Sequence, residues 1–200
     1  MRKQISSGAE SIVFLNDAGN IEKNRVPKNY RITEIDGALR KSRIKRELKV
    51  LNDLKKTLLP IPNVIRSNDS TIEMEYIRGT QIKKVLDRNP LLAVKIGENL
   101  SIMHNNGIIH GDLTTSNMIL NDVNIKKLYF IDFGLSFYSK KLEDKAVDIH
   151  LFRQALESKH FKVSNEAFES FLTGYNPENK KEILERLKAV ERRGRNKEKI

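Results

Sequence analysis

Two short apolar runs in the middle of the chain each end in an aspartate. The first, "IIHGDLTTSN", spans residues 108 to 117, and the second, "YFIDFG", spans residues 129 to 134. A strand that stops at a carboxylate places a charge where the sheet ends and solvent or ligand begins, which is typical of sites rather than of cores. The sequence therefore predicts that Asp112, Asn117 and Asp132 lie together at the ends of adjacent short strands.

These three oxygen-bearing side chains match the set that phosphoryl transfer requires. The reaction needs one carboxylate to accept a hydroxyl proton, and an amide and a second carboxylate to hold magnesium against the phosphates. The Asp-x-x-x-x-Asn spacing assigns the base to Asp112 and a metal ligand to Asn117, while Asp-Phe-Gly makes Asp132 the main metal ligand. Gly134 is expected to let the chain turn directly after that ligand.

Each motif alone is a weak signal, because a bare Asp-Phe-Gly is also what a β-turn after a strand looks like. The two motifs together, in this order and about twenty residues apart, favour the catalytic interpretation. His110 could serve as an acid or base, but a structural role that orients the loop by hydrogen bonds is favoured. Asp148 is expected to cap the start of a helix.

Composition limits the metal and the compartment. The 200 residues include no cysteine and only four histidines, so any metal is expected to be a hard ion bound by oxygen. No segment has the roughly eighteen apolar residues of a membrane span, and the first residues lack the apolar core of a secretory signal. The expectation is a cytoplasmic protein with no membrane partner.

The net charge of +11 is concentrated in two segments. Residues 23–57 carry twelve lysines and arginines against four acidic residues, and residues 178–200 carry nine against five. Such an excess is typical of contact with RNA or an acidic protein, and equally of solvated helix faces. Composition alone leaves both interpretations open.

The first part of the chain is expected to be rich in strands. "SIVFL" at residues 11–15 and the turn "NDAGN" after it indicate a hairpin, and "VIRS" with "TIEMEYI" indicates a second one. Between them, apolar residues at helical spacing predict a helix from about residue 35 to 58. Pro60 and Pro62 follow this helix and prevent its continuation.

The second part is expected to be mainly helical. Helices are predicted over "IKKVLDR" and "LLAVKIGENLSIMHNNG", and again from near residues 145, 165 and 177. The basic tail from about residue 191 has no apolar face, so it is expected to be mobile unless a ligand or partner orders it. The sequence thus predicts an α+β, bilobal fold, with residues 1–78 as a small β-rich lobe and 79–200 as a reduced helical lobe.

The chain resembles the protein kinase-like fold, and within it the small RIO-related atypical kinases of the KEOPS complex, also called the p53-related protein kinase family. The resemblance covers residues 5 to 195. It is carried, in order, by the segments "GAES", "KNRVPKNYR", "EID", "LRKSRIKRE", "IHGDLTTSN", "IDFGLSF" and "RRGR". The pair "HGDLTTSN" and "IDFGLSF" is more specific than general kinase similarity.

The resemblance implies further site residues. Lys23 would meet the α- and β-phosphates of ATP, and Glu47 would be its ion-pair partner, so that both join Asp112 as catalytic residues. The resemblance also implies a lid over the nucleotide, formed by Gly8, Ala9 and Glu10. It further implies a hinge whose backbone meets the adenine edge, formed by Met74, Glu75, Tyr76 and Ile77. The cofactors implied are ATP and Mg²⁺.

Two departures from ordinary protein kinases narrow the expected activity. Gly111 stands where kinases regulated by loop phosphorylation carry arginine, and no Ala-Pro-Glu or long activation segment follows Asp132. Ordinary kinases dock peptide substrates on that segment. An ATPase or autokinase that acts inside a complex is therefore favoured over a free signalling kinase.

The function implied is that of the kinase and ATPase subunit of KEOPS, which forms N6-threonylcarbamoyladenosine in tRNA. Its implied partners are the threonylcarbamoyl-transferase subunit and a small regulatory subunit on the β-rich lobe. The basic helix and the tail residues would suit contact with tRNA or a partner, chiefly through Arg192, Arg193 and Arg195. The alternatives are a stand-alone serine/threonine kinase and a nucleotide-sensing scaffold without turnover. A small-molecule kinase shares His-Gly-Asp, but the short C-terminal half leaves little room for its substrate.

Overall fold

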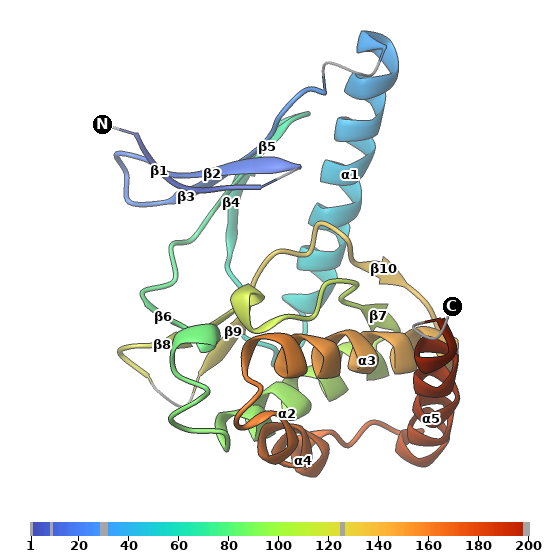
Figure 1. The fold of residues 1–200 in the computed structure, drawn as a ribbon. Coiled ribbons are helices and arrows are strands. Elements are labelled where there is room, and N and C mark those ends of the chain that lie inside the picture. Colours follow the sequence, from blue (N-terminus) through green and yellow to red (C-terminus); the bar gives the residue numbers. More distant parts are fainter. Residues whose placement is uncertain (1, 9, 29–31, 125–126, 198–200) are drawn as a thin grey trace.

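The computed structural model describes the chain except residues 1, 9, 29–31, 125–126 and 198–200. An antiparallel sheet forms the upper part of the molecule in Figure 1, and most helices lie below it. The strand order of this sheet is β1-β2-β3-β5-β4. The bounds are β1 (Lys3–Ser7), β2 (Ser11–Leu15), β3 (Ile21–Arg25), β4 (Val64–Ser67) and β5 (Thr71–Met74).

Both expected hairpins are present, β2 with β3 and β4 with β5. In the second hairpin the Asn68 carboxamide oxygen accepts hydrogen bonds from the backbone N–H groups of Ser70 and Thr71, which is how asparagine stabilises a tight turn. Strand β1 was not expected, because its sequence, "KQISS", is polar and all five residues are exposed. It is held by pairing with β2 rather than by burial.

Helix α1 (Thr33–Leu54) connects the two parts of the molecule. Ile44 packs with Ile72 and Met74 of the sheet, whereas the last turns of α1 belong to the main core shared with the lower helices. The helix ends at Leu54 rather than near residue 58, because the hydroxyl of Thr57 donates to the Leu54 carbonyl at 2.6 Å and closes the last turn. Residues in the middle of α1 therefore lie between the two parts.

The lower part contains α2 (Leu92–Asn105), α3 (Leu142–Lys159), α4 (Ser164–Gly174) and α5 (Lys180–Lys197). Helix α2 packs on α4, and α3 packs on α5. One expectation was wrong here, and the expected mobility of the basic tail stays a prediction. Residues 82–88 form a short 3-10 helix, η1 (Ile82–Lys84), followed by turns, and the basic tail continues α5 as far as Lys197. Ile82 and Leu86 are both fully buried. Their packing in the core therefore determines the backbone conformation of this segment and overrides its helix propensity.

Short strands lie between the sheet and the helices. β6 (Gly79–Gln81), β8 (Met118–Asn121) and β9 (Leu128–Phe130) pair in the order β6-β8-β9, while β7 (Ile108–Ile109) pairs with β10 (Phe137–Tyr138). The expectation that the three site residues follow adjacent strands was therefore wrong in detail. The strand before Asp112 is not a neighbour of β8 or β9, and Asn117 precedes β8 at the end of the 3-10 helix η2 (Thr115–Asn117).

The chain passes from the upper to the lower part between β5 and β6. Strand β6 pairs with β8 and so belongs to the lower part. The division into lobes at residue 78 stays a prediction. Within the described residues, none of the helices combines the length and apolar character needed to cross a bilayer.

Candidate active site

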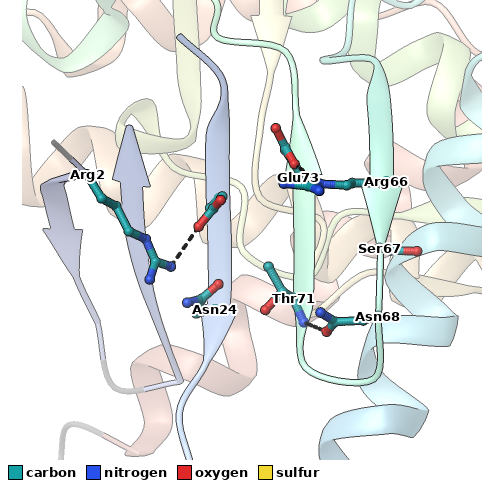
Figure 2. A pocket seen from close by; sticks show the side chains of 8 residues that line it. Arg2, Asn24, Arg66, Ser67, Asn68, Thr71 and Glu73 are labelled. Carbon is teal, nitrogen blue, oxygen red and sulfur yellow. Dashed lines mark hydrogen bonds and ion pairs between the residues drawn. The ribbon is translucent and has the colours of Figure 1, made fainter. Parts of the chain in front are cut away.

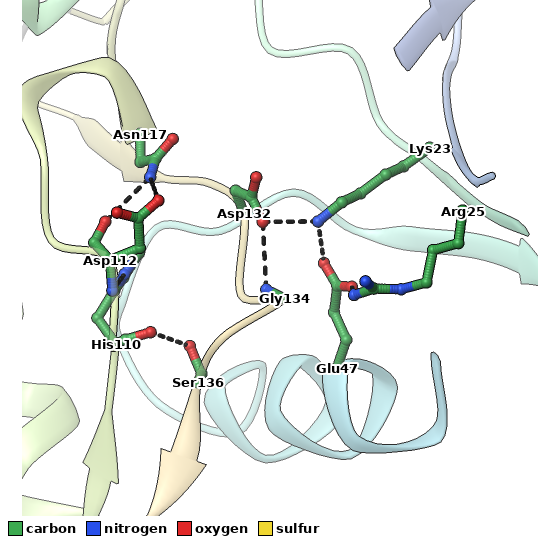
Figure 3. Close-up of polar contacts among 9 residues, drawn as sticks. All are labelled: Lys23, Arg25, Glu47, His110, Asp112, Asn117, Asp132, Gly134 and Ser136. Atoms are coloured by element: carbon green, nitrogen blue, oxygen red, sulfur yellow. Dashed lines mark hydrogen bonds and ion pairs between the residues drawn. The ribbon is translucent and has the colours of Figure 1, made fainter. Parts of the chain in front are cut away.

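Lys23 and Glu47 form a buried ion pair where α1 crosses the sheet. Lys23 lies on β3 and Glu47 on α1, and the Lys23 Nζ donates to the Glu47 Oε1 at 2.6 Å. Their side chains are 7% and 1% exposed. Figure 3 shows both pointing toward the turn after β9. The structure thus brings together the lysine and glutamate that the resemblance pairs, and their catalytic roles stay predictions.

Lys23 also links the sheet and Glu47 to Asp132 in the lower part of the molecule. Its Nζ donates to the Asp132 Oδ1 at 2.6 Å. Burial would lower the pKa of Lys23, but the carboxylates of Glu47 and Asp132 outweigh it and leave that pKa raised. Burial would raise the pKa of Asp132, and the Lys23 ammonium outweighs that effect and leaves it lowered. Lys23 and Asp132 are therefore both charged at neutral pH.

The backbone at Asp132 is unusual. Its φ of 63° lies in the left-handed region that non-glycine residues rarely adopt, which is common at functional sites. Gly134 lies in the turn that was expected after Asp132, where the Ser136 N–H donates to the Phe133 carbonyl, although the positive φ belongs to Asp132. The absence of a side chain on Gly134 leaves room for the neighbouring polar groups. A Cβ on it would lie 3.1 Å from the Asp132 Oδ1 and 3.3 Å from the Lys23 Nζ.

Asp112 and Asn117 form the lower half of the site. The Asn117 Nδ2 donates to the backbone carbonyl of Asp112 at 2.9 Å and to its Oδ2 at 2.8 Å. The Asn117 carbonyl accepts from the N–H of Ile131 at 2.9 Å, which ties this loop to the residue before Asp132. The three residues singled out from sequence are therefore gathered at one place (Figure 3).

The buried Asp148 holds the loop that carries Asp112. Its carboxylate accepts from the N–H groups of His110 and Gly111 at 2.8 and 2.9 Å, and contacts the Nε2 of His104 at 3.2 Å. Burial raises the pKa of Asp148, but these hydrogen bonds and the nearby histidines outweigh burial and leave it lowered. The expected role as a helix cap was wrong, because Asp148 lies in the interior of α3, which begins at Leu142.

Gly111 is required by this arrangement. Its φ is 79°, and a Cβ would lie 2.5 Å from the Leu135 carbonyl oxygen, closer than real atoms approach. An arginine at this position would be strained on both counts. The absence of arginine here therefore has a local structural cause.

His110 is fully buried between the aromatic rings of Phe130 and Phe133. Burial lowers its pKa more than the surrounding carboxylates raise it, so the ring is neutral. Its carbonyl accepts from the Ser136 Oγ at 2.8 Å, and its Nδ1 contacts the N–H of Asp112 at 3.3 Å. These contacts favour the orienting role over a role as acid or base.

A second anchor of the loop was missed by the sequence analysis. The Thr115 Oγ1 lies 2.9 Å from the Nε2 of buried His160, whose Nδ1 lies 2.7 Å from the Asp87 Oδ1. This relay ties η2 to the end of α3. No local pattern connects positions 87, 115 and 160, so nothing in the sequence alone would have found it.

The remaining expected nucleotide contacts are only partly described. The Gly8 N–H donates to the Ser11 carbonyl at 2.9 Å within the β1–β2 turn, and Glu10 forms an ion pair with Arg43 of α1. Ala9 lies outside the described residues. Met74 is the last residue of β5, and residues 75–77 follow it toward β6. Met74 and Ile77 are buried, and the Glu75 N–H donates to the Asn63 carbonyl. The lid and the hinge stay predictions.

The basic tail, at the end of α5, lies away from the candidate active site (Figure 1). Arg192 and Arg193 are exposed on α5, and Arg193 forms an ion pair with Glu143 at the start of α3. The side chain of Arg195 lies outside the described part of the chain. Contact of these arginines with tRNA or a partner stays a prediction.

The oxygen ligands fit a magnesium–nucleotide complex better than a free metal. The described residues contain no group of three His, Cys, Asp or Glu side chains placed to hold a metal. Mg²⁺ is commonly bound by one or two protein ligands together with substrate phosphates and water. The Asp132 side chain is 47% exposed, and Asn117 bonds Asp112 through its nitrogen, which leaves its amide oxygen as a ligand. Asp132 and Asn117 could therefore hold a magnesium ion that arrives with ATP.

A hollow of about 360 Å³ lies elsewhere, on the face of the sheet opposite Glu47 (Figure 2). Its charged residues neutralise each other in pairs, Arg2 with Glu22 and Arg66 with Glu73. Glu73 also accepts hydrogen bonds from the side chains of two turn residues of the β2–β3 hairpin. The hollow contains none of the phosphoryl-transfer groups, so it is not the candidate active site.

The fold and the site together define a bilobal, protein kinase-like phosphotransferase. The structure of the Rio2 kinase from Chaetomium thermophilum in complex with ADP, Mg²⁺ and phosphoaspartate is similar, with a TM-score of 0.61 over 97% of this chain and 70% of that one. The two share 15% sequence identity, so the likeness concerns the fold. A family model described as the RIO domain matches residues 21–149.

More narrowly, the chain belongs to the RIO-type atypical kinase family that includes the Bud32 subunits of KEOPS. It is 38% identical to the KEOPS complex subunit Bud32 of Pyrococcus abyssi, over 98% of this chain and 97% of that protein. The corresponding EKC/KEOPS subunit of Enterocytozoon bieneusi is 41% identical, over 97% and 98%. A probable bifunctional tRNA threonylcarbamoyladenosine biosynthesis protein of Methanobrevibacter smithii is 41% identical, and the chain spans 36% of its length.

Proposed function

We propose that this chain is the ATP-hydrolysing serine/threonine kinase subunit of a KEOPS complex, required for N6-threonylcarbamoyladenosine formation in tRNA. The observation that carries the proposal is the convergence of Lys23, Glu47, Asp112, Asn117 and Asp132 in one site. Full-length relatives named as KEOPS subunits support the assignment to the complex.

The chain's own residues account for each part of the chemistry. Asp112 accepts the proton of the attacking hydroxyl or water as its oxygen bonds to the γ-phosphorus and the bond to the leaving ADP oxygen breaks. Lys23 moves from Asp132 to the α- and β-phosphates and so orients them. Asp132 and Asn117 would hold magnesium, which when bound neutralises charge on the phosphates.

The bifunctional relative supports one partner in particular. Because this chain spans 36% of that protein, a second functional unit is joined to the kinase-like part in one polypeptide. Fusion holds the two units at high effective concentration. Separate proteins lack that link, so the corresponding subunits would have to bind each other directly to work together. We infer that this unit corresponds to the threonylcarbamoyl-transferase subunit, with a small regulatory subunit on the β-rich lobe.

An ATPase confined to a complex fits the structure better than a kinase acting on many proteins. Only the short strand β10 lies between Asp132 and the start of α3 at Leu142, and it pairs with β7. This arrangement leaves no long segment for docking a peptide. The basic helix α1 and the end of α5 would contact tRNA or the partner, and a phosphate contact would weaken as salt rises.

Reconstitution with the transferase subunit and tRNA tests the proposal. ATP hydrolysis and threonylcarbamoyladenosine formation are measured for wild type and Asp132→Asn, each with and without the partner. The proposal predicts that the partner and tRNA stimulate hydrolysis, and that Asp132→Asn abolishes both activities. A basal rate that responds to neither would contradict the coupled model, and strong labelling of an unrelated protein pool would favour the stand-alone kinase.

A further inference from the structure

Arg25 is the buried cation of the site to which the sequence analysis gave no role. It lies two residues after Lys23 on β3, and residues two apart on a strand point to the same face. Its Nη2 donates to the Glu47 Oε2 at 2.6 Å, and its side chain is only 3% exposed. Figure 3 shows Arg25 and Lys23 approaching the same carboxylate from one strand.

The two oxygens of Glu47 are thus divided between two cations. Lys23 binds Oε1 and Arg25 binds Oε2. Lys23 also binds Asp132, and under the proposed function it must turn to the phosphates of ATP. A buried carboxylate that loses its partner is strongly destabilised. Arg25 keeps Glu47 neutralised and in place while Lys23 changes its contacts.

Arg25 also reaches the turn after Asp132. A Cβ on Gly134 would lie 3.0 Å from the Arg25 Nη2, which is tighter than ordinary contacts. The guanidinium therefore fills the space directly against this turn. Arg25 contacts α1 on one side and the Asp-Phe-Gly turn on the other, so it links the positions of Glu47 and Asp132.

The burial of Arg25 argues against a direct contact with nucleotide. Its Nη2 is occupied by Glu47, and its Nε is buried with no hydrogen-bond partner among the described residues. A buried unpaired donor costs stability, so this position is poorly explained by stability alone. A role in holding Glu47 explains why a large cation lies there.

We propose that Arg25 is a positioning residue that keeps the Lys23–Glu47 pair permanently assembled, with or without bound nucleotide. The proposal rests on the proposed phosphotransfer function. It suits a chain with glycine at position 111 and no long segment between Asp132 and α3 that could assemble the pair on demand. The site would then be regulated by partners acting on ATP entry or product release rather than by making or breaking this pair.

A double-mutant cycle tests Arg25 against Glu47. The variants are Arg25→Met, Glu47→Gln and the double variant, with Arg66→Met as a matched control, since Arg66 pairs with Glu73 on the opposite face of the same sheet. The turnover number and KM for ATP are measured beside ADP affinity by calorimetry and the folded fraction by circular dichroism. Arg25→Met is expected to lower turnover roughly tenfold to a hundredfold, because misplaced catalytic groups cost that much.

The decisive result is coupling. If Arg25 acts through Glu47, Arg25→Met causes no further loss of turnover or ADP affinity in the Glu47→Gln background. Losses that multiply, or an Arg25→Met protein indistinguishable from Arg66→Met, would overturn the proposal. If the wild-type protein binds ADP but does not turn over ATP, the proposed function is wrong. The double-mutant cycle measured on ADP affinity would still test the role of Arg25. If Arg25→Met does not fold, Arg25→Lys takes its place, with a smaller loss expected.

Discussion

The β3–α1 side of the site is held by charges, whereas the catalytic-loop side is held by hydrogen bonds to buried groups. On the first side Lys23, Arg25, Glu47 and Asp132 form a charge cluster in which Lys23 is shared between two carboxylates. On the second side Asp148 and His160 anchor the loop of residues 110–117 through its backbone and through Thr115.

Under the proposed function, this difference separates the residues that would change their contacts from those that would stay in place. Lys23 and Asp132 form an ion pair that nucleotide and magnesium would separate, so the charge cluster would change its contacts during the reaction. The described hydrogen bonds of Asp148 and His160 involve neither Lys23 nor Asp132. Asp112 and Asn117 would therefore be held in position before ATP binds, as preorganised catalytic groups are in efficient sites.

The largest effect is expected at the proposed base. Asp112→Asn keeps an acceptor for the Asn117 amide but cannot take up a proton, so ATP turnover should fall about a thousandfold. The free energy of unfolding and the affinity for ADP should change little. A variant that retains more than about a tenth of the wild-type turnover would remove Asp112 from that role.

The next largest effect is expected at the loop anchor on α3. Asp148→Asn replaces an acceptor of two backbone N–H groups by a group with a single acceptor oxygen, and should cost about 3 kcal/mol of unfolding free energy. Urea denaturation measures this cost. Asp144→Asn on the same helix, where the aspartate meets only the Ser139 hydroxyl among the hydrogen bonds described, serves as control and should cost less than about 1 kcal/mol.

Acidification should weaken the loop side first. Burial lowers the pKa of both His104 and His110 below the unfolded value of about 6.5. Below that pH the unfolded chain binds protons that the folded chain does not, so stability falls as pH falls. The slope should approach about 1.4 kcal/mol per pH unit for each histidine. In His104→Gln the free energy of unfolding should depend less steeply on pH between 6.5 and 5.5, because unfolding then takes up about one proton fewer. An unchanged slope would count against this explanation.

The smallest effect is expected at the second anchor. Thr115→Val removes the hydroxyl contact to His160 in a buried position and should cost about 1 kcal/mol, with a few-fold loss of turnover as η2 loosens. Thr114→Val, one residue earlier and only half-buried, provides the matched comparison. Equal effects of the two variants would mean that the relay through His160 does not hold the loop.

The parts of the site that sequence could predict are those with local spacing. Asp112, Asn117 and Asp132 stand in short motifs, and α2 was visible from its apolar periodicity. Asp148 was misjudged, because its partners lie 37 and 38 residues away and only tertiary packing brings their N–H groups to it. Arg25 looked like one of twelve cations between residues 23 and 57, and only its burial and its ion pair with Glu47 distinguish it.

The most direct test of the central claim is the effect of magnesium on ATP affinity, measured by calorimetry in wild type and in Asp132→Asn. If Asp132 and Asn117 hold magnesium against the phosphates while Lys23 orients them, magnesium should strengthen ATP binding to wild type. In Asp132→Asn the affinity should be nearly the same with magnesium or with chelator. Equal magnesium dependence in both proteins, or none in wild type, would contradict the assignment of this site.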